Sequence, residues 1–177
     1  MSVLVNDLLD YTRVRSGHGL SVSLATCDLR RICEELIDAL GAANPQQQFH
    51  AELVGDLVMQ ADEKRLEQLL ANLLSNAAQH GGPDNPVTLA ARGDVDTISL
   101  AVKNLGHPIP PSLLPTIFEP LVQGAQMEGG TDLSRGSIGL GLFIVREIVR
   151  GHQGTIDVES SEGDGTTFSV KLPRTAG

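Results

Sequence analysis

Apolar residues recur at intervals of three and four along several parts of the chain, which is the period of an amphipathic helix. On this basis, helices are expected at residues 1–14, 28–40, 62–80 and 140–150, with a shorter one at 112–116. Asp28 and Asp62 are residues of the type that caps a helix N-terminus. Gly41 is expected to end the second helix.

Alternating apolar and polar residues predict strands between these helices. They are expected at residues 20–25, 49–54, 57–60, 87–92, 97–103, 154–160 and 166–172. Short turns join six of them into three expected hairpins, at 49–60, 87–103 and 154–172. Strands and helices in this order indicate an α+β fold, with one mostly antiparallel sheet and its helices on one face.

A long polar segment interrupts the pattern at residues 122–137, which are glycine-rich and show no periodicity. Such a segment inside a compact domain is usually a lid or a binding loop. It leads into residues 136–142 (GSIGLGL) and then into the last expected helix. Glycines before a helix N-terminus let a phosphate approach the unpaired backbone N–H groups. We therefore expect a lid over a nucleotide.

The composition fits one globular domain with a small appendage. Of the 177 residues, 41% are hydrophobic and 20% charged, which is enough for a core. The net charge of −9 argues against non-specific binding to nucleic acid or an anionic membrane, but not against a nucleotide. Because no long apolar run is present, we expect a cytoplasmic segment without membrane contact. Cys27 and Cys33 are expected to be buried free thiols.

The helix expected at 62–80 has an unusual polar side. At about 100° per residue, its polar residues fall in one arc of about 80°: Arg65, Gln68, Asn72, Asn76 and Gln79. Amides dominate this arc, where a surface helix usually carries Lys and Glu. An Asn carbonyl oxygen can bind a hard cation such as Mg²⁺. The alternative is an ordinary exposed polar face.

Two further features are weaker when taken singly. The first helix has a broad apolar face, which either docks onto this domain or forms half of an oligomerising hairpin; we favour the hairpin. Asn104 and Gly106 follow a strand, where Asn104 can face a pocket and Gly106 lets a flat ligand pass close to the backbone. This segment could also be an ordinary turn.

Taken together and in order, these segments resemble the catalytic ATP-binding domain of sensor histidine kinases, within the wider family of gyrase, MutL and a heat-shock chaperone. Five segments carry the resemblance: Asn72–Ala77 (N box), Asn104-x-Gly106 (first glycine box), Phe118–Pro120 (F box), Gly139–Leu142 (second glycine box) and Gly163–Phe168 (third glycine box). With Pro108 and Ser137-Ile138, the glycine boxes are similar to the variant found in phytochrome-type kinases.

The resemblance implies a two-layer α/β sandwich with ATP between the N-box helix, the glycine boxes and the lid. Asn72 would bind Mg²⁺, Asn76 would contact phosphate or metal, the backbone of Gly139–Leu142 would hold phosphates, and Thr166 would help to seat adenine. The full expected ATP site consists of Asn72, Asn76, Gln79, His80, Asn104, Gly106, Ile109, Arg135, Ser137, Gly139, Leu140, Gly141, Leu142 and Thr166.

The same resemblance implies a protein-histidine kinase that passes the γ-phosphate to a histidine on a dimerisation hairpin, and from there to a response regulator receiver domain. Residues 8–13 resemble the end of the second dimerisation helix. We therefore expect that part of that helix at 1–18, a catalytic domain at 19–177, and a homodimer in the full-length protein. None of the five histidines precedes an acidic residue, as the acceptor would. The acceptor is thus expected outside this chain, which alone should not autophosphorylate.

Three departures from the family pattern qualify this expectation. Asn104 stands where Asp usually reads adenine, so weaker ATP binding and poorer discrimination against GTP are expected. Gln79 and Gln123 stand where basic residues are common, so phosphate contacts would fall more on Arg135. These departures leave open a catalytically weak nucleotide-binding or partner-docking module. An anti-sigma-type serine kinase of the same fold is also conceivable, but the N-terminal helix counts against it.

Overall fold

A computed structural model of the chain describes residues 3–122 and 139–175. Its helices are α1 (Val3–Arg15), α2 (Leu29–Ala43), α3 (Glu63–Gly81) and α4 (Gly141–Gly151), with a short 3₁₀ helix η1 (Leu114–Thr116). Its strands are β1 (Ala25–Asp28), β2 (Phe49–Val54), β3 (Val58–Ala61), β4 (Val87–Gly93), β5 (Thr97–Asn104), β6 (Thr155–Ser161) and β7 (Gly165–Pro173). No helix in these ranges is long and apolar enough to cross a lipid bilayer.

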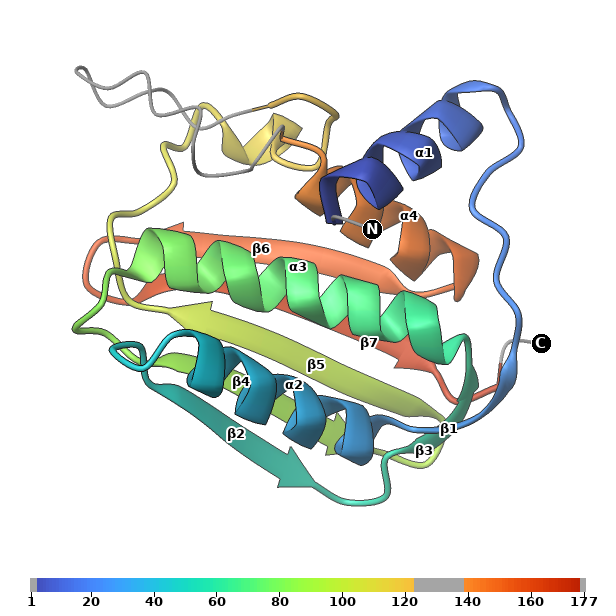
Figure 1. Cartoon of the computed structure of the whole chain (residues 1–177), viewed down its shortest axis with the longest axis horizontal. Helices are drawn as coiled ribbons and strands as arrows, with labels where there is room; N and C mark the ends of the chain where they lie inside the picture. The colour runs from blue at the N-terminus through green and yellow to red at the C-terminus, as the bar shows by residue number, and fades with distance from the viewer. Residues whose placement is uncertain (1–2, 123–138, 176–177) are drawn as a thin grey trace.

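One sheet of five strands, in the order β2-β4-β5-β7-β6, carries helices on one face (Figure 1). Its β4–β5, β5–β7 and β6–β7 pairs are antiparallel, which confirms the predicted α+β class and two of the predicted hairpins. The predicted hairpin at 49–60 is wrong. Instead, β2 pairs in parallel with β4, and β3 pairs with β1 in a separate two-stranded sheet. A parallel pair needs a long crossover, and α3 provides most of it.

Three smaller expectations also need correction. The strand predicted at 20–25 starts only at Ala25, because the Ser23 backbone N–H donates to the Asp62 carboxylate rather than to a neighbouring strand. The second helix passes Gly41 and ends at Ala43, where the Asn44 backbone and side chain both donate to the Leu40 carbonyl. The short helix expected at 112–116 forms only the 3₁₀ turn.

The core lies between the sheet and its helices. The predicted apolar side of α3 is confirmed, because all six of its residues are at most 1% exposed: Leu66, Leu69, Leu70, Leu73, Leu74 and Ala77. Cys27 and Cys33 are free and buried, as expected. Desolvation raises the pKa of the Cys27 thiol to about 11 and that of Cys33 to about 12. Both thiols are therefore protonated and unreactive near neutral pH.

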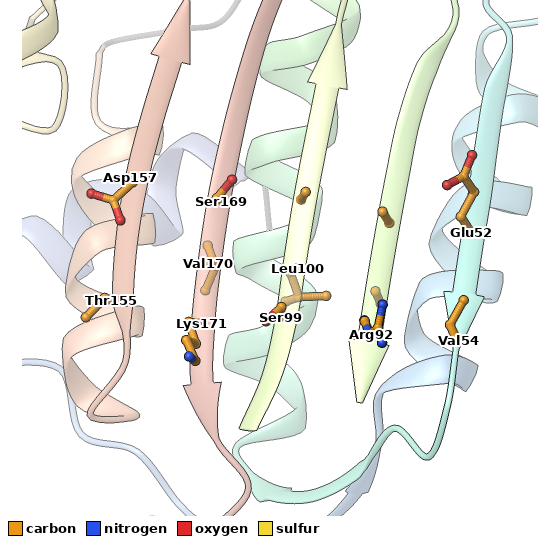
Figure 2. A pocket seen from close by; sticks show the side chains of 13 residues that line it. Glu52, Val54, Arg92, Ser99, Leu100, Thr155, Asp157, Ser169, Val170 and Lys171 are labelled. Atoms are coloured by element: carbon orange, nitrogen blue, oxygen red, sulfur yellow. The ribbon is translucent and has the colours of Figure 1, made fainter. Parts of the chain in front are cut away.

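The opposite face of the sheet is hollowed at its centre (Figure 2). Across the strands, Glu52, Ala90, Ala101, Ser169 and Asp157 lie in one row of partners. The small side chains in the middle of this row form the floor of a cavity of about 490 Å³. Within the part of the chain that the structure describes, no residue of the expected ATP site lines this cavity.

Arg174 ties two turns of the fold together. Its guanidinium donates to the carbonyls of Asp94, Val58 and Asp56. We expect Arg174→Ala to lower the free energy of unfolding by about 2 kcal/mol, because three carbonyls lose a charged donor. Urea unfolding would measure this loss. Arg92→Ala is the matched control, because that side chain is 73% exposed, and an equal loss in both variants would contradict the prediction.

Candidate nucleotide-binding site

The predicted polar stripe of α3 is divided between two partners. Arg65 forms a paired hydrogen bond with the Asp10 carboxylate of α1, at 2.6 and 3.1 Å. Gln68 also donates to Asp10, at 3.0 Å. One turn further along, the side-chain amide of Asn72 donates to the backbone carbonyl of Gly141, at 3.3 Å. Arg65 and Gln68, the first residues of the stripe, thus bind α1, and Asn72 contacts the start of α4.

The N-terminus of α4 differs from those of α2 and α3. Asp28 and Asp62 cap α2 and α3 with their carboxylates, as predicted. Leu140 occupies the corresponding position of α4 and makes no side-chain capping bond. The intrahelical ladder starts where Ile144 N–H donates to the Leu140 carbonyl. The N–H groups of residues 141–143 therefore have no acceptor within the helix and, together with the helix dipole, favour an anion.

Gly139 closes the base of the expected lid. Its φ is +74°, and a Cβ atom there would lie 3.0 Å from the Val122 carbonyl oxygen, so a side chain would be strained and crowded. Leu121 N–H donates to the Gly139 carbonyl at 2.9 Å. The described residues that flank segment 123–138 therefore meet beside the start of α4. The predicted site residues Arg135 and Ser137 lie outside the described residues.

The F box anchors the first of these ends. Phe118 packs edge-to-face on Phe168 of β7, with ring centroids 6.1 Å apart. Glu119 forms an ion pair with Arg146 of α4 at 2.9 Å. Arg146 in turn lies over the ring of Phe143, 5.4 Å from its centroid. The segment leading to the lid is thus fixed to both the sheet and α4.

The other end of the expected site lies where β5 ends and β7 begins. Asn104 and Thr166 are register partners and are 2% and 4% exposed. The Thr166 hydroxyl lies 2.7 Å from that of Ser160, and the Ile109 N–H donates to Ser160 at 2.8 Å. Ser160 thereby joins the predicted residues Ile109 and Thr166. The sequence reasoning missed Ser160, although its place opposite Thr166 follows from the correctly predicted hairpin.

Gly106 connects this end to the C-terminus of α3. A Cβ atom on Gly106 would overlap the backbone carbonyl of His80, so glycine lets the turn after β5 lie against the end of the helix. The side chains of Gln79 and His80 are exposed, and that of Asn76 is half-buried. α3 therefore spans the site, from Asn72 beside α4 to His80 beside the turn that follows Asn104.

Comparison with known proteins identifies the family to which this chain belongs. Residues 61–176 match the family described as histidine kinase-, DNA gyrase B-, and HSP90-like ATPase. The chain belongs to this ATPase family. The predicted resemblance and the predicted fold are thus confirmed.

Several relatives of this ATPase domain are sensor proteins. The chain is 33% identical to the alginate biosynthesis sensor protein KinB of Pseudomonas aeruginosa, over 97% of the chain and 28% of KinB. It is 37% identical to the probable sensor histidine kinase TcrY of Mycobacterium tuberculosis, over 96% of the chain and 35% of TcrY. A bacteriophytochrome of Pseudomonas aeruginosa is 31% identical, over 98% of the chain and 23% of that protein. The chain spans at most 35% of the length of these three relatives.

Solved structures agree with the sequence relatives. Full-length ShkA in complex with AMPPNP has a TM-score of 0.79 and 26% identity, covering 98% of this chain and 36% of ShkA. The catalytic domain of histidine kinase ThkA in a nucleotide-free form has a TM-score of 0.73 and 26% identity, covering 86% of this chain and 97% of that domain. ThkA in complex with the response regulator protein TrrA has a TM-score of 0.76 and 25% identity, covering 97% of this chain and 46% of that chain.

The geometry around Asn72 bears on its predicted role as a ligand of a divalent cation. Among the described residues, no group of three His, Cys, Asp or Glu side chains is placed to hold a metal ion. A cation bound at Asn72 would therefore take most of its ligands from phosphates and water, as Mg²⁺ commonly does. The Asn72 amide suits this role, because its nitrogen faces the Gly141 carbonyl and its oxygen is turned away from that partner.

The helix that precedes the ATPase fold has two different sides. Asp7, Asp10 and Tyr11 face the domain, and Tyr11 packs edge-to-face on Phe143 of α4 at 5.6 Å. Figure 1 shows α1 next to α4, with the two helices running in different directions. Desolvation, with a smaller effect of the Asp10 carboxylate, raises the pKa of Asp7. The other side keeps three apolar residues 46–49% exposed: Val5, Leu8 and Leu9. The helix docks on the domain, and its role in a dimerisation hairpin stays a prediction.

Proposed function

We propose that this chain is the ATP-binding, phosphoryl-donating part of a sensor histidine kinase. It would bind Mg²⁺-ATP between α3, α4 and the turn after β5, and pass the γ-phosphate to a histidine outside the chain. The observation that carries the proposal is the uncapped N-terminus of α4, which is joined to the N box by the Asn72–Gly141 hydrogen bond. The relatives named as sensor kinases and the AMPPNP complex of ShkA support it.

Each end of the site would have its own task. The N–H groups of residues 141–143 would bind phosphate oxygens, with Asn72 and Asn76 facing the triphosphate from α3. Mg²⁺ would neutralise phosphate charge during transfer. At the adenine end of the site, the Ser160 hydroxyl would hold Thr166 and the Ile109 backbone in place around the nucleotide base. Transfer of this kind depends mainly on positioning, which the paired ends of β5 and β7 and two packed helices would supply.

The partners would be a dimerisation hairpin that carries the acceptor histidine, and a response regulator receiver domain. The exposed apolar residues of α1, Val5, Leu8 and Leu9, fit the remainder of such a hairpin, because a helix with an apolar side needs a packing partner. The structure of ThkA with TrrA supports the regulator. The full-length protein would be a homodimer, and this part of it would lie in the cytoplasm. The net charge of −9 fits protein partners and a nucleotide rather than nucleic acid.

A transfer assay tests the function directly. The chain is mixed with a separately produced dimerisation hairpin from a relative and with ATP labelled on the γ-phosphate, and nucleotide binding is followed in parallel by calorimetry. Acid-labile phosphohistidine on the hairpin is expected. Binding without transfer would favour a nucleotide-binding module, and phosphoserine would favour a serine kinase. If neither ATP nor ADP binds in the presence of Mg²⁺, the proposal is wrong.

Asn104 supports the alternative of a catalytically weak nucleotide-binding module. An amide stands there at the adenine end of the site, where the family usually has a carboxylate. We expect Asn104→Asp to strengthen ATP binding by roughly fivefold and to improve discrimination against GTP, since a hydrogen bond to a charged acceptor is stronger. Calorimetry with ATP and GTP would measure both effects. Asn44→Asp makes the same chemical change at the exposed end of α2. If the parent chain, Asn104→Asp and Asn44→Asp bound ATP and GTP with equal affinity, the prediction for Asn104 would be wrong.

A further inference from the structure

A carboxylate from outside the five sequence motifs reaches the N box. Asp7 of α1 is 5% exposed and accepts a hydrogen bond from Gln68 at 3.1 Å. It also interacts with the side-chain amide of Asn72. Among the described residues, no ion pair joins Asp7 to a cationic side chain, whereas neighbouring Asp10 pairs with Arg65. Asp7 is therefore a buried carboxylate held by two neutral amides.

These contacts determine which way the Asn72 amide faces. A carboxylate and a backbone carbonyl can only accept hydrogen bonds. Asn72 donates to the Gly141 carbonyl of α4 at 3.3 Å. It follows Gln68, the donor to Asp7, by one turn of α3, and the Asp7 carboxylate acts on it as an acceptor, so both partners favour the amide nitrogen on their side. The opposite orientation would bring Oδ1 against both acceptor oxygens. The Asn72 oxygen is thereby turned away from both partners.

We propose that Asp7 is a positioning residue for the divalent cation of the ATP site: together with the Gly141 carbonyl it orients the Asn72 amide so that Oδ1 can bind the metal. The inference rests on the proposed function, because it needs a nucleotide-bound cation at Asn72. It adds a residue from the helix before the ATPase fold, which no sequence motif of the site includes. Residues that hydrogen-bond to a metal ligand fix the orientation of that ligand and affect the affinity of the site for the metal.

The same contacts couple the position of α1 to the nucleotide. The Asp10–Arg65 ion pair, whose side chains are 8% and 17% exposed, and the Tyr11–Phe143 contact hold α1 so that Asp7 reaches Asn72. A dication at Asn72 would also attract the nearby buried Asp7 carboxylate, which forms no ion pair within residues 3–122 and 139–175. Docking of α1 and binding of Mg²⁺-nucleotide should therefore strengthen each other, and by linkage the effect is reciprocal.

The test separates the cation from the nucleotide. Binding of ADP and of a non-hydrolysable ATP analogue to the whole chain is measured by calorimetry, once with saturating Mg²⁺ and once with EDTA. Asp7→Asn keeps the shape of the side chain but removes its charge. We expect this variant to weaken binding by roughly tenfold with Mg²⁺ and by less than about twofold in EDTA. Hydrogen exchange of the α1 amides should slow on adding Mg²⁺-nucleotide in the parent chain, but not in Asp7→Asn.

Two controls separate positioning from a general effect on the fold. Asp38→Asn makes the same change at an exposed position of α2. It should alter nucleotide affinity neither with Mg²⁺ nor in EDTA. In an Asn72→Ala background, Asp7→Asn should cost nothing further, because its effect runs through Asn72. An equal loss with and without Mg²⁺, or a full additional loss in the Asn72→Ala background, would overturn the inference. Absence of nucleotide binding by the parent chain would instead overturn the proposed function.

Discussion

Replacing Gly165 with alanine is expected to lower the free energy of unfolding by roughly 3–5 kcal/mol. Two costs combine at this position. The φ of Gly165 is +77°, where a side chain strains the backbone, and an added Cβ would overlap the Asn104 carbonyl oxygen. The overlap would push β7 away from β5 at the register pair Asn104–Thr166. Molecules that remain folded should therefore also bind ATP poorly. Urea unfolding and calorimetry measure the two losses.

Gly163 offers a matched control in the same turn. Its φ is +92°, but nothing lies within 4 Å of an added Cβ. Gly163→Ala should therefore show the cost of backbone strain alone, about 1 kcal/mol, with ATP affinity unchanged. If the two alanine variants were equally stable and bound ATP equally, the close approach of Gly165 to Asn104 would have no role in shaping the site.

Asn72→Ala is expected to reduce phosphoryl transfer to a separate hairpin by roughly 10²–10³-fold. The change removes the amide that faces the triphosphate end and also the hydrogen bond to Gly141 at the start of α4. The Mg²⁺-dependent part of nucleotide affinity should fall with the rate, while the free energy of unfolding should fall by only about 1 kcal/mol, because the half-buried Asn72 loses its hydrogen bond to Gly141.

Initial rates of phosphohistidine formation at saturating ATP measure the effect of Asn72→Ala. Ser75→Ala serves as the control, since this residue is exposed on the same helix and should retain the parent rate. A variant lacking Asn72 that transfers phosphate at the parent rate would show that the N box does not serve as the metal end of the site.

Local signals in the sequence predicted much of this fold. The apolar spacing of α3 identified its six buried residues, because helix periodicity is written into neighbouring turns. The Asp62 cap and the β6–β7 hairpin followed from short-range chemistry in the same way. The parallel pairing of β2 with β4 did not, because the alternation of β2 is the same whichever strand lies beside it.

The site was predictable where its motifs are continuous and not where distant segments meet. The pattern of α1 predicted a broad apolar face in need of a partner, but it did not predict that Asp7 and Asp10 would be buried while Leu8 and Leu9 stay about half exposed. Arg65 and Gln68 make this possible by supplying donors from α3. A carboxylate can be buried only where such partners exist, and a single helix pattern contains no information on partners far along the chain.

The hydrogen bond from Leu121 to Gly139 has a further consequence for protein engineering. Because it joins the described residues on either side of segment 123–138, those residues form a closed neck at which the segment begins and ends. Loop length costs little free energy once its ends are fixed, roughly 0.6 kcal/mol per doubling. Segments of other lengths and sequences, taken from relatives, could therefore be exchanged at this neck to alter nucleotide turnover while the sheet and its helices stay as they are.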